Sequence, residues 1–264
     1  MKTKKTSLED FKQIYSHPSA ILFRAIELGV IYKNTEKINL RQPSLDIGCG
    51  DGKIANVLFD EKFTYGVDNG EAKDVQEAID NKIYGKVFLE SAEKMSLPDN
   101  SINFAFSNCV IEHIPDNEAV LSEVSRILKK DGDFIFTVPS HLYPSFLYLT
   151  NKLASMGLGR LSQFYKYRRN KMLNQFHCYS AKDWEKKLSK HGFRIVKHQY
   201  YVSKKTLMLW DKMALQIFFL RIFHKKANGI VMKKYQHDIE ECYRRDTASS
   251  NYDGAGLFIH CVKK

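Results

Sequence analysis

The sequence predicts an α/β fold in which a mostly parallel, doubly wound sheet is covered by helices on both faces. Short apolar runs rich in β-branched and aromatic residues alternate with segments whose apolar residues recur at helical spacing. This alternation is typical of a parallel sheet, because each helix returns the chain to start a new strand in the same direction. With 264 residues, 44% of them hydrophobic, the chain can bury a full core, and one elaborated domain is expected rather than two.

The expected elements follow in order along the first half of the chain. Residues 8–33 have helical apolar spacing that breaks at His17-Pro18, which predicts two helices. Strands are expected at about 44–48, 63–68, 86–90, 102–108 and 133–138, and helices at about 53–60, 71–81 and 117–129. Toward the end we expect a helix around Trp184 and Leu188, a strand at 193–196 and a last strand at 256–262.

Two stretches of the second half interrupt this alternation. The first, about 139–178, has a helical patch from Leu147 to Met156 and then arginines and lysines interleaved with aromatic residues. Such a mixture suits recognition of phosphates or sugars and stacking on bases. The second, about 204–250, contains an apolar run at 213–223 that is too short to span a bilayer.

Three glycines at alternate positions, Gly48, Gly50 and Gly52, separate the first expected strand from the next helix. Glycine permits positive φ and leaves no Cβ in the way, so a ligand can approach the backbone near a helix N-terminus. A nicotinamide fingerprint needs glycine or alanine where Lys53 stands, and the Gly-Lys-Ser/Thr run of a phosphate-binding P-loop is absent. The spacing therefore argues against both of these nucleotide sites.

Acidic residues end the first two strands. Asp68 lies twenty positions after Gly48, where a carboxylate can accept hydrogen bonds from both hydroxyls of a ribose. Asp46, two residues before the first glycine, can accept from a cationic group or through water. Together with the glycine loop, these residues predict a nucleoside ligand without a pyrophosphate.

Four ordered segments carry a resemblance to a known family. Residues 45–52, Leu-Asp-Ile-Gly-Cys-Gly-Asp-Gly, resemble the first motif of class I S-adenosylmethionine (SAM) dependent methyltransferases, and Asp68 matches their ribose-binding acid. Residues 91–101 resemble the adenine-side loop. Residues 102–116 and 127–139 are similar to the fourth-strand and fifth-strand segments of the branch that methylates small molecules and lipids, the methyltransferase type 11-like branch.

The resemblance implies a Rossmann-like, seven-stranded sheet whose last strand is antiparallel. It implies SAM as cofactor, S-adenosylhomocysteine as product, and a helical cap at residues 1–40 before a domain at 41–264 with inserts at about 139–178 and 204–250. The cofactor-binding positions that it implies are Asp46, Gly48, Cys49, Gly50, Gly52, Asp68, Asn69, Ser91, Ala92, Glu93, Met95, Asn108 and Cys109. Two positions depart from the family: Ser91 replaces the usual aspartate, and Lys130-Asp131-Gly132 replaces the usual Pro-Gly-Gly turn.

Methyl transfer from a sulfonium is an in-line displacement that needs alignment and exclusion of water. A base is needed only for a hydroxyl or an acidic carbon, and the candidates are His113, His141 and His177. Glu112 is weaker, because an ordinary carboxylate is a poor base toward an alcohol, and His113 has the alternative role of holding a loop.

The resemblance also implies that the N-terminal helices cap the site. Tyr15, His17 and Arg24 would then face the acceptor, and the alternative is that these helices only pad the sheet.

Charge divides the chain. Residues 1–139 carry 17 Lys and Arg against 22 Asp and Glu, whereas residues 140–264 carry 24 against 8, so a net −5 and a net +16 make up the total of +11. The basic half predicts an anionic acceptor or surface, such as a phosphorylated lipid carrier, nucleotide sugar, acidic glycan, membrane face or RNA. The alternative is an ordinary solvated, lysine-rich surface.

The second insert, at about 204–250, is also compatible with a peripheral membrane contact through about 204–234. Its aromatic residues would then face the acyl chains, and its lysines would face anionic headgroups. Its apolar side could equally be buried in a dimer or against the domain. The oligomeric state is left open.

The leading function is methyl transfer to a small-molecule, glycan or lipid-linked acceptor. An RNA methyltransferase is the alternative, although the Asn/Asp-Pro-Pro-Tyr/Phe motif of adenine-amine methylation and the Pro-Cys motif of cytosine C5 methylation are absent. A non-catalytic SAM-binding scaffold is the third hypothesis.

The cysteines and the N-terminus bear on localisation. Five scattered cysteines favour reduced thiols over a disulfide framework or zinc site, and no metal is expected. The first residues have no apolar segment of a signal peptide, which predicts a cytoplasmic protein, including the inner face of a membrane.

Overall fold

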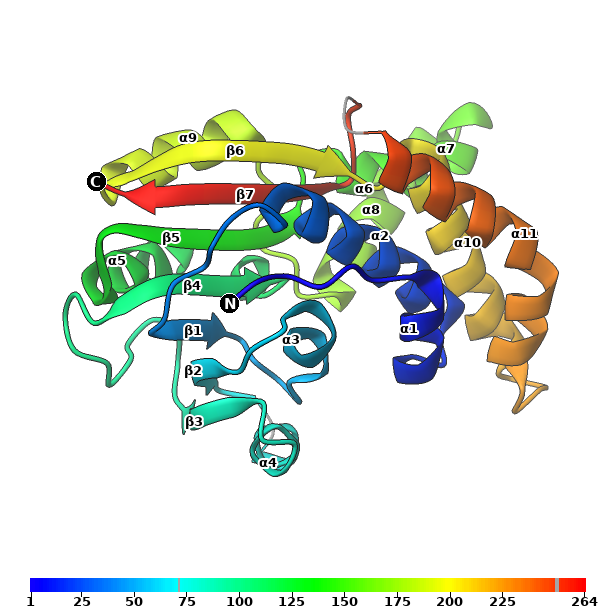
Figure 1. Cartoon of the computed structure of the whole chain (residues 1–264). Coiled ribbons are helices and arrows are strands. Elements are labelled where there is room, and N and C mark those ends of the chain that lie inside the picture. The colour runs from blue at the N-terminus through cyan, green and yellow to red at the C-terminus, as the bar shows by residue number, and fades with distance from the viewer. Residues whose placement is uncertain (71, 250–251) are drawn as a thin grey trace.

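The computed structural model describes residues 1–70, 72–249 and 252–264 (Figure 1). Within them lies a seven-stranded sheet in the order β3-β2-β1-β4-β5-β7-β6. The strands are β1 (Ser44–Ile47), β2 (Phe63–Asp68), β3 (Tyr84–Leu89), β4 (Ile102–Asn108), β5 (Leu128–Pro139), β6 (Phe193–Tyr201) and β7 (Gly256–Lys263). The pairs among β1 to β5 are parallel, and β7 is antiparallel to both β5 and β6. The predicted Rossmann-like fold with an antiparallel last strand is confirmed.

Strand β5 begins earlier than the expected 133–138. It starts at Leu128, directly after the preceding helix, and its pairing with β4 shifts register between Ile102 and Phe104. Asp131 has a φ of +59°, and a Cβ on Gly132 would lie 2.8 Å from the Lys129 carbonyl oxygen. The departure from the usual Pro-Gly-Gly turn therefore produces an irregular start of a strand.

Alternate residues of the strands build two separate cores. Phe104 and Phe106 belong to one core, whereas Ala105 between them belongs to the other, because successive side chains of a strand point to opposite faces. The core on the first face includes residues of α1 (Leu8–Ile14), α2 (Pro18–Thr35), α3 (Lys53–Leu58), α10 (Lys204–Leu220) and α11 (Ala227–Ala248). The second face is covered by α5 (Asn117–Ile127) and α9 (Ala181–Lys190).

The N-terminal segment forms the two predicted helices, and α2 begins at Pro18, a residue suited to the first helical position. Helix α2 buries residues around most of its circumference, because α10 and α11 pack against it on the side away from the sheet. Helix α4 (Ala72–Asp80) lies next to β3. Residue 71, the first of the helix expected at 71–81, and residue 250, the last of the second insert, lie outside the described residues.

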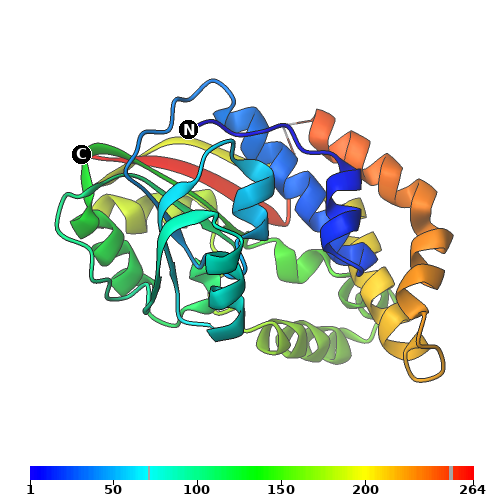
Figure 2. The ribbon, with the colours of Figure 1, turned by 60° about the horizontal axis from the view of Figure 1, so that its bottom comes forward.

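The two interrupting stretches are helical. The first contains α6 (Tyr143–Phe146), α7 (Tyr148–Ser155) and α8 (Gly159–Met172), and the sequence did not predict that the basic, aromatic segment is a helix. The second is the pair α10 and α11, joined by residues 221–226. These helices gather beyond the carboxyl ends of the parallel strands, and Figure 2 shows α8 and the α10–α11 turn along one margin of the molecule. In the described part of the chain, none of the helices combines the length and apolar character needed to cross a bilayer.

Candidate active site

The loop between β1 and α3 makes its turn with three left-handed glycines. A Cβ on Gly48, at φ +74°, would lie 2.3 Å from Val110, and one on Gly52, at φ +76°, would lie 2.8 Å from Ile83. A Cβ on Gly50, at φ +49°, would have no atom within 4 Å. The chain therefore needs glycine for close packing at two positions, while at Gly50 the backbone borders open space.

Asp68 is held at the end of β2 by backbone amides. Its Oδ2 accepts a hydrogen bond of 2.7 Å from the Gly50 N–H, and its Oδ1 accepts one of 2.6 Å from the Gly70 N–H. A carboxylate oxygen has two lone pairs, so each oxygen retains an acceptor position for a ligand. Asp68 thus has the fixed orientation that recognition of two neighbouring hydroxyls requires.

A cavity of about 250 Å³ lies beside this carboxylate. Its lining comes from the ends of β1, β2, β3 and β4 and the segments that follow them: Gly48, Val67, Asp68, Asn69, Glu90, Ser91, Ala92, Glu93, Cys109, Val110, His113, Ile114 and Pro115. Ser91 donates a 2.9 Å hydrogen bond to Glu93 Oε2. The serine that replaces the family's aspartate therefore stands next to a carboxylate in the same cavity.

Other predicted cofactor positions do not line the cavity. Asp46 is buried and accepts a 2.6 Å hydrogen bond from the Tyr84 hydroxyl, and burial raises the pKa of Asp46 to about 7 although this bond lowers it. Cys49 is buried, and burial also raises the pKa of its thiol. Met95 packs in the core on the second face. Gly50 and Gly52 also lie outside the cavity lining, and both belong to the loop that borders it.

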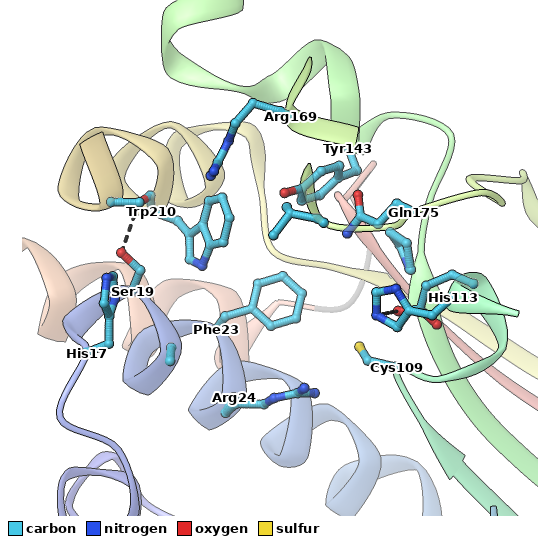
Figure 3. A pocket seen from close by; sticks show the side chains of 15 residues that line it. His17, Ser19, Phe23, Arg24, Cys109, His113, Tyr143, Arg169, Gln175 and Trp210 are labelled. Atoms are coloured by element: carbon cyan, nitrogen blue, oxygen red, sulfur yellow. Dashed lines mark hydrogen bonds and ion pairs between the residues drawn. The ribbon is translucent and has the colours of Figure 1, made fainter. Parts of the chain in front are cut away.

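A second cavity, of about 380 Å³, opens on the other side of the strand ends (Figure 3). Helices α2, α6, α8 and α10 and the segment after β4 contribute its lining: His17, Ser19, Ala20, Phe23, Arg24, Cys109, Glu112, His113, Pro139, Tyr143, Arg169, Leu173, Gln175, Trp210 and Ala214. Cys109 and His113 line both cavities. Cys109 directly follows β4 and has a φ of +52°, a conformation rare for residues with a side chain.

A buried ion pair fixes α2 to the ends of the strands. Arg24 pairs with Glu27 and donates a 2.8 Å hydrogen bond to Asn108 Oδ1. Glu27 Oε1 accepts from the Tyr201 hydroxyl at 2.6 Å and from the Cys109 thiol at 3.0 Å. Burial alone would raise the pKa of Glu27, but Arg24 and these donors hold it below its usual value. Asn108, a predicted cofactor residue, is thus engaged by Arg24.

Several buried polar atoms of the second cavity have no hydrogen-bond partner among the described residues: Glu112 Oε2, Arg169 Nε and Gln175 Oε1. Such atoms are costly unless a ligand or water meets them. Arg169 is oriented by Asp211, 3.3 Å from one terminal nitrogen, and by the Trp210 ring, whose centroid is 5.2 Å from the guanidinium carbon. Burial raises the pKa of Glu112 to about 8, so this carboxyl is mainly protonated at neutral pH.

The three candidate histidines occupy different places. His113 Nδ1 lies 3.1 Å from the Asn174 carbonyl oxygen, which can only accept, so Nδ1 carries the proton and Nε2 of the neutral ring keeps its lone pair. His177 stacks on Tyr179, and its Nε2 lies 2.9 Å from the Ile114 carbonyl oxygen, while His141 is exposed. Neither lines either cavity, so the structure brings only His113 of the three to the junction.

Of the three residues expected to face the acceptor, His17 and Arg24 line the second cavity and Tyr15 does not. Sequence reasoning missed Phe23, Tyr143, Gln175 and Trp210 as lining residues. Trp210 lies in an insert whose apolar character was visible, but Tyr143 and Gln175 carry no local signal, because only the tertiary packing of α6 and α8 brings them to the cavity.

Within the described residues, no group of three His, Cys, Asp or Glu side chains is arranged to hold a metal ion. Each of the five cysteines, all of which are described, is a free thiol.

A parallel sheet with an antiparallel β7, a glycine loop after β1 and a fixed acid at the end of β2 define the class I SAM-dependent methyltransferase fold. Residues 45–136 match the methyltransferase type 11 family model, described as a methyltransferase domain. The chain therefore contains a class I, type 11-like methyltransferase domain.

Individual relatives resemble this domain. Phosphoethanolamine N-methyltransferase 2 of Caenorhabditis elegans is 30% identical over 105 residues, which are 37% of this chain and 24% of that protein. Trans-aconitate 2-methyltransferase of Rhizobium rhizogenes is 25% identical over 100 residues, 38% of this chain and 39% of that protein. The chain thus matches about a quarter to two fifths of the length of these relatives.

Among solved structures, phosphoethanolamine N-methyltransferase 2 of Haemonchus contortus in complex with S-adenosyl-L-methionine superposes with a TM-score of 0.53 at 18% identity. The match covers 98% of this chain and 60% of that one. At this identity the similarity shows the shared fold, and it extends beyond the residues matched by the family model.

Proposed function

We propose that the protein transfers a methyl group from SAM to a small acceptor that carries an anionic group. The observation that carries this proposal is that two cavities meet at Cys109 and His113. One lies beside the glycine loop and Asp68, and the other has an aromatic and polar lining. A methyltransferase needs this arrangement, because donor and acceptor must approach within contact distance of each other.

The residues around the smaller cavity fit SAM. Asp68 offers two oriented carboxylate oxygens to the ribose hydroxyls, Gly48 places backbone at the cavity wall, and Ser91 to Glu93 border the expected adenine side. When bound, SAM supplies a methyl group already activated on a sulfonium. The co-product of the transfer is S-adenosylhomocysteine, the thioether that remains once the methyl group has been transferred.

The chain contributes alignment and exclusion of water. The ion pair of Arg24 and Glu27 fixes α2 over the ends of β4 and β6, and Phe23 on α2 faces Tyr143 and Trp210 across the cavity (Figure 3). This arrangement supports a role for residues 1–40 as a cap over a domain at 41–264. An apolar enclosure of this kind keeps water away from the transferring group.

Arg169 supports an anionic acceptor. Its guanidinium is held by Asp211 and Trp210 at the wall of the cavity, and its buried Nε has no hydrogen-bond partner among the described residues. The protonated Glu112 adds no opposing charge at neutral pH and can donate a hydrogen bond. The relatives named for phosphoethanolamine and trans-aconitate act on acceptors with phosphate or carboxylate groups, which agrees with this chemistry.

His113 is the proposed base if the acceptor loses a proton. Its Nε2 lone pair lies where the cavities meet, and the Asn174 carbonyl fixes the ring tautomer. Glu112 Oε1 lies 3.7 Å from Nε2, so the buried carboxyl is the nearest acidic group to this nitrogen.

The test uses methyl-labelled SAM with extracts separated into small-molecule, lipid, glycan and RNA fractions. We expect label in a small-molecule or lipid component that is retained on an anion-exchange resin. Arg169→Gln should raise the KM for that acceptor by about ten-fold or more, since a hydrogen bond to a charged group contributes about 1.5–3 kcal/mol. The control Arg160→Gln changes an exposed arginine on the same helix and should leave the KM unchanged.

Each other result contradicts a defined part of the proposal. Label in RNA would assign the protein to RNA methylation. SAM binding without label in any fraction would indicate a non-catalytic scaffold. An equal KM for Arg169→Gln and the wild type would show that Arg169 does not bind an anionic group of the acceptor. We also propose a cytoplasmic location at a membrane surface, which the exposed apolar side chains Phe218 and Phe219 at the end of α10 support.

A further inference from the structure

One end of the molecule exposes large apolar side chains that are not packed in either hydrophobic core. At the end of α10 and in the following turn, Phe218, Phe219, Ile222 and Phe223 have exposed fractions of 68%, 60%, 66% and 81%. We call residues 218–226 the tip. A soluble surface rarely exposes four such side chains within six positions, and clusters of this kind mark contacts with a partner or a membrane.

Helix α8 extends this apolar surface. Its Phe164 and Met172 are 61% and 64% exposed. A groove of about 210 Å³ is lined by Tyr165, Arg168 and Met172 from α8 and by Leu215 and Phe218 from α10. The two helices therefore lie side by side here, and Figure 2 shows both at the same margin.

The segments that form this surface, residues 159–172 and 212–226, carry cations and no acidic residue. No aspartate or glutamate occurs between Asp133 and Asp183, the stretch that contains α8, or between Asp211 and Asp238, the stretch that contains the tip. The exposed cations include Arg168 on α8 and Arg221, Lys225 and Lys226 in the tip. Aromatic side chains surrounded by lysines and arginines match an anionic lipid surface, where the rings enter the interface and the cations meet the headgroups.

We propose that the tip and α8 dock onto an anionic membrane. A second copy of the chain fits less well, because a two-fold contact would place the same cations against each other. The length of the apolar segment agrees with a peripheral contact, since the tip is one short turn between two helices.

The docking surface leads into the proposed acceptor site. The groove between α8 and α10 shares Arg169 and Ala214 with the larger cavity. An amphiphile whose apolar chain lies in the groove would present its anionic headgroup to Arg169. This last step rests on the proposed function, whereas membrane docking itself does not.

The test measures binding of the full chain to phosphatidylcholine vesicles with and without phosphatidylglycerol. We expect binding only to the anionic vesicles. Lys225→Glu with Lys226→Glu should weaken it by roughly 25-fold or more, because each cation near an anionic surface contributes about five-fold in affinity. The matched control, Lys186→Glu with Lys190→Glu, reverses two exposed lysines on α9 and should retain most of the binding.

The apolar contribution is tested with Ile222→Ser and Phe223→Ser together, against Ile79→Ser and Leu89→Ser at distant exposed positions. The tip pair should lose vesicle binding, and the control pair should keep it. Titration of each variant with S-adenosylhomocysteine verifies that the cofactor site is intact, so loss of docking is distinguished from failure of the proposed function.

Three results would overturn the inference. In the first, the wild type does not bind anionic vesicles. In the second, both tip double variants bind these vesicles as tightly as the wild type does. In the third, the wild type is a dimer that Ile222→Ser with Phe223→Ser separates into monomers without affecting vesicle binding, which would assign the surface to a second copy.

Discussion

Replacing Glu112 with glutamine should change how the stability of the protein depends on pH. Burial raises the pKa of Glu112 from its usual 4.5 to about 8 in the folded chain, and the Oε2 atom has no partner among the described residues. The folded state therefore holds this proton more tightly than the unfolded state. As pH rises from about 4.5 to about 8, the unfolded chain releases the proton first, and the folded state loses stability.

The size of this effect follows from the shift in pKa. One unit corresponds to about 1.4 kcal/mol, so the shift from 4.5 to about 8 amounts to roughly 5 kcal/mol of unfolding free energy. Glutamine cannot ionise, and the Glu112→Gln variant should escape this loss. Relative to the wild type, the variant should gain stability steadily across this range and level off above about pH 8.

Urea denaturation at several pH values between 4 and 9 measures this difference. Glu185→Gln, a change of the same kind at an exposed position on α9, serves as the control. The Glu112→Gln curve should diverge from the wild-type curve with increasing pH. Parallel curves for the wild type and Glu112→Gln would show that the Glu112 carboxyl ionises in the folded protein as easily as in the unfolded chain. The conclusion that Glu112 is neutral in the proposed acceptor cavity would then be wrong.

Two further predictions concern the loop and the junction of the cavities. Gly48→Ala should destabilise the protein by roughly 2–5 kcal/mol and abolish cofactor binding, because left-handed strain adds to a clash in which the new Cβ would lie 2.3 Å from Val110. Gly50→Ala, with the same strain but open space, should cost only about 1–2 kcal/mol, and equal losses by thermal denaturation would contradict the packing argument. His113→Ala should slow turnover about 100-fold or more while leaving cofactor affinity unchanged, and unchanged turnover would return His113 to a structural role.

The order of strands and helices could be predicted because local patterns determine it. The runs at 63–68 and 102–108 coincide with β2 and β4, and Pro18 marks the start of α2. That several of the proposed cofactor residues lie together was also predictable, because they follow consecutive parallel strands whose carboxyl ends meet at one edge. Gly48, Asp68 and Ser91 accordingly line one cavity.

The orientation of individual side chains was less predictable. Asp46 belongs to the same motif as Gly48, but it points into the protein toward Tyr84, a partner contributed by β3 that no local pattern identifies. The larger cavity, the proposed acceptor site, depends even more on tertiary packing. Tyr143, Arg169 and Trp210 come from three helices that interrupt the alternating pattern, and their convergence follows from how these helices pack beyond the sheet.

Calorimetric titration with S-adenosylhomocysteine tests the central claim most directly. The wild type and the control Asp74→Ala, which changes an exposed acid on α4, should bind with similar affinity. Asp68→Ala should bind at least about 30-fold more weakly, since it removes the carboxylate that the Gly50 and Gly70 amides orient toward the ribose. Equal affinity of Asp68→Ala and the wild type, or no binding by the wild type, would contradict the assignment of this cavity as the cofactor site.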